Sequence, residues 1–178
     1  MPDQKNPETI EEFIGQLHTE TGWDGLILKN VEQKGNTVLV TKLTIKGQDY
    51  EVQIRGLESR QVIALNVYFP ITVIEGKFVD ATMLCNRINQ DRNYSGKITL
   101  DDKGLITSKA LLFVEDLMQL KKMVYLMLDS CCALFERYSE ALTAVAQTTK
   151  TYETIRDQEC QHKAIENKPR FTPPFTSQ

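Results

Sequence analysis

The sequence contains few of the residues from which catalytic sites are usually built. Among 178 residues there are two histidines, His18 and His162, one tryptophan and four cysteines. The patterns G-x-S-x-G, G-x-x-x-x-G-K-[ST] and G-x-G-x-x-G, which mark a serine nucleophile, a P-loop and a dinucleotide-binding loop, are absent. We therefore expect a protein that is not an enzyme and needs no cofactor.

The chain also lacks clustered positive charge and long apolar runs. Its formal charge is -3, and its basic runs are no longer than a pair such as Lys121-Lys122. A nucleic-acid-binding protein usually carries a clustered basic surface. The densest apolar segment, residues 122–135, contains Asp129 and is shorter than the roughly 20 residues that cross a bilayer. We expect neither nucleic acid nor a membrane among the partners.

The four cysteines form no spaced framework. Cys131 and Cys132 are adjacent, which suits a structural disulfide poorly, and a zinc site would need four converging ligands where only Cys160 and His162 are close in sequence. The N-terminal residues are polar and acidic, unlike a secretory signal. We expect reduced thiols, no metal and a cytoplasmic location. Cys132 is expected to be more exposed than Cys85 and Cys131, because it lies off its helix's apolar stripe.

The remaining composition is that of a folded protein, with 41% apolar and 25% charged residues. A first helix is predicted to begin where Asn6 can cap and Pro7 suits the first helical position. It is predicted to end at Gly22. Between them, apolar residues recur at helical spacing: Ile10, Phe13, Ile14 and Leu17.

From Gly25 the apolar period changes to two, which predicts β-strands. Pro70 is expected to end the last of these strands or to mark a sheet edge, because proline cannot donate to a ladder. The predicted strands cover residues 26–28, 37–45, 50–55 and 61–69.

Two further helices follow from spacings of three and four. One is predicted from about Val79 to Asn89, and the other runs for about 30 residues, or roughly 45 Å, from Leu117. Three residues widen the apolar stripe of the long helix beyond one neighbour: Leu128, Phe135 and Leu142. Because a wide stripe is often buried against a second copy, we expect a homodimer.

The segment from Asp91 to Gly104 matches two incompatible structures. As an EF-hand loop it would bind calcium through Asp91, Asn93, Ser95 and Asp102. As a β-hairpin it would turn at residues 101–104, where Gly104 can take a positive φ. We favour the hairpin because Asp102 is shorter than the usual bidentate glutamate and Gly104 falls where an exiting helix would begin. A calcium-responsive module that uses this loop is the alternative function.

The central part of the chain resembles the YbjN-type family, described as bacterial sensory transduction regulators. In that family a helix ends in an N-x-x-N-like stretch, and a "gk…ld.dG.i" hairpin and a terminal helix follow. Asn86 and Asn89 match the first feature, and five residues match the second: Gly96, Lys97, Leu100, Asp101 and Gly104. The resemblance covers about Phe78 to Leu142, and more loosely the N-terminal helix and strands.

The resemblance implies the type III secretion chaperone-like fold. In this α+β fold an antiparallel sheet packs against N-terminal, middle and long C-terminal helices. We expect one such domain over residues 1–148. Residues 149–178 are expected to be a polar, proline-containing and partly disordered extension.

Type III secretion chaperones are small acidic dimers without enzymatic activity that hold an extended segment of another protein. By resemblance, we expect a chaperone-like or regulatory protein-binding module that captures a partner segment by sheet-edge or apolar-groove contacts. Trp23 is either an anchor for a partner or a helix-end residue packed on the sheet. The expected contact residues are Trp23, Ile63, Leu65, Val67, Leu84 and Ile88.

Overall fold

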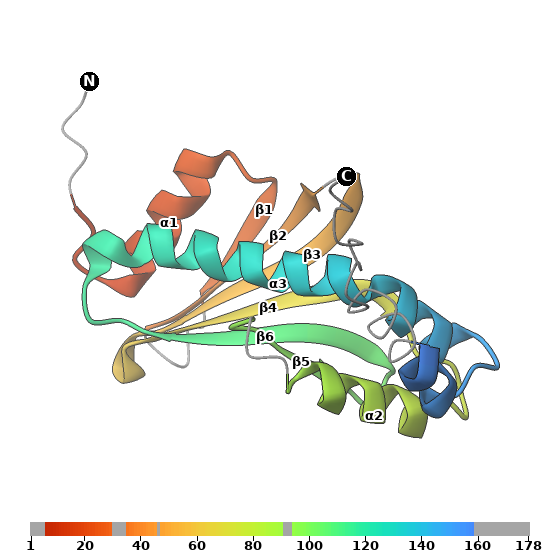
Figure 1. Cartoon of the computed structure of the whole chain (residues 1–178). Coiled ribbons are helices and arrows are strands. Elements are labelled where there is room, and N and C mark those ends of the chain that lie inside the picture. Colours follow the sequence, from red (N-terminus) through yellow and green to blue (C-terminus); the bar gives the residue numbers. More distant parts are fainter. Residues whose placement is uncertain (1–5, 30–34, 46, 91–93, 159–178) are drawn as a thin grey trace, which may run out of the picture.

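The structure is a computed structural model that describes residues 6–29, 35–45, 47–90 and 94–158. It is an α+β fold in which helices cover a single antiparallel sheet (Figure 1). The strands are β1 (Gly25–Lys29), β2 (Asn36–Ile45), β3 (Gln48–Leu57), β4 (Val62–Thr72), β5 (Lys97–Leu100) and β6 (Leu105–Phe113). The helices are α1 (Ile10–Thr21), α2 (Phe78–Ile88) and α3 (Leu117–Gln147), with a 3-10 turn at Glu58–Arg60 and a further helical segment at residues 152–158.

The six strands lie in the order β1-β2-β3-β4-β6-β5, and every neighbouring pair is antiparallel. β1 and β5 are therefore the two edge strands. The predicted strands, the middle helix and the long C-terminal helix are confirmed, and α3 has 31 residues. None of the helices in the described part of the chain is both long and apolar enough to cross a membrane.

The two faces of the sheet differ because strand residues alternate between them. On β3, Val52 and Ile54 are buried beneath the helices, whereas Glu51 and Arg55 are exposed on the opposite face. Figure 1 shows α3 lying across the covered face, with α1 and α2 toward its two ends. No described helix covers the other face, which we call the open face.

Helix α1 begins three residues later than the sequence suggested. Its N-cap is Thr9, whose Oγ1 accepts a hydrogen bond from the Glu12 amide at 3.1 Å, so the expected cap at Asn6 is wrong. The Glu12 carboxylate also accepts from the amide of Glu8, the residue before the cap, at 2.8 Å, whereas in a capping box it would accept from the amide of the cap residue itself. The predicted end at Gly22 is confirmed by its φ of 62°.

Pro70 neither ends a strand nor marks a sheet edge. It lies within β4, which continues to Thr72 and has neighbours on both sides. The proline is tolerated because the β3 ladder stops at Tyr68 and the β6 register shifts between Tyr68 and Thr72. Its missing N–H therefore falls in an irregular part of the ladder.

The hairpin between β5 and β6 is confirmed. The Gly104 amide donates to the Asp101 carbonyl at 3.0 Å, and Gly104 has a φ of 80°. The Asp101 Oδ1 atom accepts from the amides of Lys103 and Leu105 at 2.9 and 2.8 Å. The chain therefore turns back into β6 at the point where an EF-hand would start its second helix.

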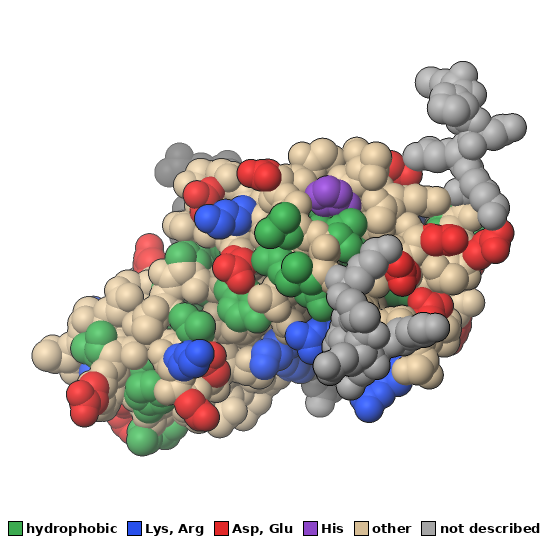
Figure 2. Space-filling view, turned by 180° about the vertical axis from the view of Figure 1, so that it is seen from behind, with side chains coloured by type: hydrophobic (Ala, Val, Ile, Leu, Met, Phe, Trp, Pro, Cys, Tyr) green, Lys and Arg blue, Asp and Glu red, His purple; other side chains and the backbone are tan. Residues whose placement is uncertain are grey.

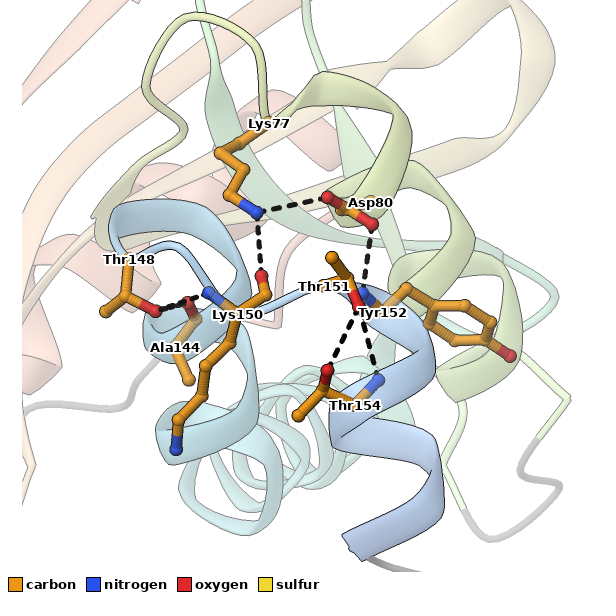
Figure 3. A network of polar contacts seen from close by, with 8 residues as sticks. All are labelled: Lys77, Asp80, Ala144, Thr148, Lys150, Thr151, Tyr152 and Thr154. Carbon is orange, nitrogen blue, oxygen red and sulfur yellow. Dashed lines mark hydrogen bonds and ion pairs between the residues drawn. The ribbon is translucent and has the colours of Figure 1, made fainter.

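The beginning of the expected extension is held against the start of α2 (Figure 3). Lys77 Nζ donates to the Lys150 carbonyl at 2.7 Å and to Asp80 Oδ2 at 3.1 Å. The Tyr152 amide donates to Asp80 Oδ1 at 2.9 Å, and Ile155 is buried in the core. The folded unit therefore continues to residue 158; residues 159–178 of the extension lie outside the described residues.

Candidate functional site

Most of the residues expected to contact a partner lie in the hydrophobic core. They line the covered face of β4 or the inner side of α2, and each is at most 2% exposed: Ile63, Leu65, Val67, Leu84 and Ile88. In this conformation their side chains are covered by α1, α2 and α3 and hold the helices to the sheet. The surface available to a partner consists of other residues.

Trp23 joins the end of α1 to α3. It follows the Gly22 cap, is partly buried, and packs its ring edge-on against Tyr125 with 6.1 Å between ring centroids and an interplanar angle of 77°. Trp23 therefore contacts α3 as well as the edge of the hydrophobic core. Trp23 remains partly accessible beside the exposed side of α3.

The expected calcium ligands are only partly described. Asp91 and Asn93 lie outside the described residues, as do Cys160 and His162 of the weaker metal alternative. Ser95 and Asp102 are both exposed, and the Ser95 amide donates to Ser130 Oγ at 3.1 Å. Within the described ranges, no three His, Cys, Asp or Glu side chains are grouped to hold a metal ion.

The three described cysteines are buried, which corrects the expectation that Cys132 is exposed. Burial raises the pKa of Cys85 to about 12. It also raises the pKa of Cys131, and raises that of Cys132 to about 12 with a further contribution from the nearby negative charges of Asp129 and Glu136. At neutral pH these thiols are protonated, so they are not activated nucleophiles.

His18 has a structural hydrogen bond. Its Nε2 lies 3.2 Å from the carbonyl oxygen of Gly25, to which it donates because a carbonyl oxygen only accepts. This bond ties the last turn of α1 to the first residue of β1.

The β5 edge of the sheet is closed by a side chain. Asn89, at the C-cap of α2, donates from Nδ2 to the Ile98 carbonyl at 2.8 Å and accepts from the Ile98 amide through Oδ1 at 2.7 Å. Lys97 Nζ in turn donates to the Asn89 carbonyl at 2.9 Å. These bonds occupy backbone groups that another strand would need for pairing.

Among the described residues, the β1 edge carries no block in the middle of the strand, and the His18 bond reaches only the carbonyl of Gly25, its first residue. β1 pairs with β2 alone, and no described strand pairs with its other side. Leu26 and Leu28 point to the open face and are 70% and 56% exposed, and the one charged residue within β1 is Lys29 at its end. Figure 2 looks at the open face and shows hydrophobic side chains gathered near its middle, with charged ones around them.

The two leucines continue an apolar ladder across the sheet. Leu26 is paired with Val40, and Leu28 with Val38, both partly buried on β2. Residues 26–28 are predicted above only as a strand, and no partner contact is expected there from the sequence. Their spacing of two, with Ile27 between them, already places the leucines on the face opposite Ile27. This edge and its two leucines form the candidate site.

Neither the family models nor the curated protein sequences that were searched match this chain.

Proposed function

We propose that this chain is a non-enzymatic protein-binding module that captures an extended segment of a partner along the open edge of β1. The observation that carries the proposal is the contrast between the two sheet edges. Asn89 closes the β5 edge, whereas β1 presents its backbone beside two exposed leucines. A segment that pairs with β1 would add a seventh strand by β-augmentation.

The side chains around β1 indicate what such a segment would contain. Every second residue of an added strand would fall on the open face, beside Leu26 and Leu28. An apolar residue there would bury part of each leucine, which contributes about 25 cal/mol for each Å² of apolar surface removed from water. We therefore expect the partner segment to alternate apolar and polar residues.

The order of the elements supports the finer fold assignment. Helix, strands, helix, hairpin and long helix is the order expected for the type III secretion chaperone-like fold, and the matched residues from Gly96 to Gly104 lie in β5, just before it and in the turn that follows it. We include this fold and the YbjN-type resemblance in the proposal. They favour a chaperone-like or regulatory role for the segment that β1 binds.

The chemistry of the described residues favours binding over catalysis. The thiols of Cys85, Cys131 and Cys132 are protonated at neutral pH, and the His18 ring is hydrogen-bonded to a backbone carbonyl. The calcium alternative gains no support, because a strand follows Asp102 where an EF-hand has a helix.

The proposal can be tested by capture followed by peptide mapping. The wild-type chain and a Leu26→Lys/Leu28→Lys variant would each be used to capture proteins from the native cell. The control is Val79→Lys, which changes a similarly exposed residue on α2. We expect a protein that binds the wild type and the control but not the β1 variant.

Peptides that tile the captured protein then locate the contact. When the binding peptide is added, hydrogen exchange should slow at the amides of β1. Slower exchange at another surface with β1 unchanged, or full binding by the Leu26→Lys/Leu28→Lys variant, would overturn the proposal.

A further inference from the structure

The outer side of α3 carries a second exposed apolar surface. Met118, Leu126 and Tyr125 are 71%, 60% and 39% exposed, although α3 buries a full stripe of other residues. With Lys122 and Asp129 they recur at spacings of three and four, so they share one side of the helix. These five residues, which we call the α3 patch, line an open pocket of about 690 Å³ together with Lys121.

The patch is held in place by the elements behind it. Leu120, Val124 and Leu128 are buried on the other side of α3. Lys121 forms an ion pair with Glu20 of α1. Tyr125 packs against Trp23, as described above. The patch is therefore already formed in the single chain, and a partner that binds it would not need to order the helix first.

The residues of the patch are complementary to themselves. Lys122 and Asp129 lie at equal distances, in sequence, from the midpoint between Tyr125 and Leu126. A second α3 placed antiparallel through a two-fold axis at that midpoint brings Lys122 opposite Asp129 of the second copy. The same axis brings Tyr125 opposite Leu126. It also brings Met118 opposite the small, exposed residue Ala133.

We propose that a second copy of this chain binds at the α3 patch, with the two α3 helices antiparallel. Such an interface is isologous, because the same residues contribute from both copies. Its centre is apolar and aromatic, and one Lys122–Asp129 pair lies on each side of it. Opposite charges at these positions also select the antiparallel register, since a parallel arrangement would place Lys122 opposite Lys122.

This contact differs from the one expected from the sequence. The homodimer was inferred from Leu128, Phe135 and Leu142, which widen the stripe of α3, but all three are buried within the single chain. The surface left for a second copy is on the opposite side of the helix. It spans about four turns, so we expect a small interface and a dissociation constant on the order of 10 μM.

Charge reversal tests the proposed register directly. The variants Lys122→Asp and Asp129→Lys each place like charges opposite one another in both halves of the interface. Sedimentation velocity would be measured at protein concentrations from about 1 to about 300 μM, which lie on both sides of the expected dissociation constant. The wild type should change from monomer to dimer over this range, and each variant should stay monomeric. The control is Glu140→Lys, which lies on the same exposed side of α3 beyond the contact and should dimerise like the wild type.

The decisive measurement is the equimolar mixture of the two variants. The Lys122→Asp copy then carries two carboxylates opposite the two ammonium groups of the Asp129→Lys copy. Heterodimers should therefore form at the protein concentrations at which the wild type dimerises. The double variant Lys122→Asp/Asp129→Lys should also dimerise with itself. A monomeric wild type over the whole range, dimers of either single variant, or a mixture that stays monomeric would each overturn the proposal.

Discussion

The side-chain amide of Asn89 forms both hydrogen bonds that a neighbouring strand would give to the backbone of Ile98. One side chain therefore ends the sheet at β5. The opposite edge, at β1, has two exposed leucines. The two edges of the sheet therefore differ, and the partner segment proposed above would pair at β1.

Removing the Asn89 amide should destabilise the β5 edge. Asn89→Ala leaves the Ile98 amide and carbonyl without these partners, and we expect a loss of about 1–2 kcal/mol in the free energy of unfolding. Hydrogen exchange at the Ile98 amide should become faster by more than the loss in the free energy of unfolding accounts for. Asn86→Ala, an exposed asparagine on the same helix, is the control and should change stability by less than about 0.5 kcal/mol. Equal effects of the two variants would contradict this role.

Asp80 should make the docking of residues 150–158 dependent on pH. The backbone amide of Tyr152, and next the Lys77 ammonium, lower the pKa of the Asp80 carboxyl below its ordinary value of 3.8. Because the pKa is lower in the folded state, the stabilisation is present above the ordinary value and is lost as the pH falls through the folded pKa. Limited proteolysis should therefore cleave this segment faster near pH 3 than at pH 7.

A variant separates this effect from general acid unfolding. Asp80→Ala should make the same segment sensitive to proteolysis already at pH 7, because both Asp80 hydrogen bonds are removed. Asp157→Ala removes an exposed ion pair with Arg156 in the same segment and should have little effect. Identical cleavage rates for wild type and Asp80→Ala at pH 7 would show that the segment is held by other contacts.

Two glycine-to-alanine substitutions should change the free energy of unfolding in opposite directions. A Cβ at Gly96 would lie 2.5 Å from Ser108 Oγ and 2.8 Å from Cys131 Sγ, both buried, so Gly96→Ala should cost about 1–3 kcal/mol. A Cβ at Gly15, within α1, would meet nothing within 4 Å. Gly15→Ala should therefore stabilise the protein by about 0.5–1 kcal/mol. Urea unfolding measures both, and a stabilising Gly96→Ala would contradict the packing described around Ser108.

The buried thiols should be unreactive in the folded protein. In a Cys160→Ser background, iodoacetamide at pH 7.5 should label Cys85, Cys131 and Cys132 negligibly, because their pKa values are raised by burial. All three should react once the chain is unfolded in urea. Rapid labelling of Cys132 in the folded state would show that α3 is packed less tightly than described.

The local structure could be predicted because it depends on residues close together in the chain. The alternation in β2, β3 and β4, the spacing in α2 and α3, and the turn at Gly104 each appear within one short segment. The failures at Asn6 and Pro70 have a different origin. The helix is capped by Thr9 three residues later, and the strand could pass Pro70 because the β3 ladder stops at Tyr68 and the β6 register shifts beyond it.

The candidate site could not be predicted in the same way. Periodicity shows that Leu65 and Leu84 lie on apolar faces, and it equally shows that Leu26 and Leu28 share a face, but it does not show which of these faces another element covers. Burial depends on contacts between segments far apart in the chain, such as α3 on β4 and Asn89 on β5. The sequence alone therefore specified the strands, the helices and their apolar sides. Which sides are buried, which edge is closed and which leucines are exposed were decided by how these elements pack together.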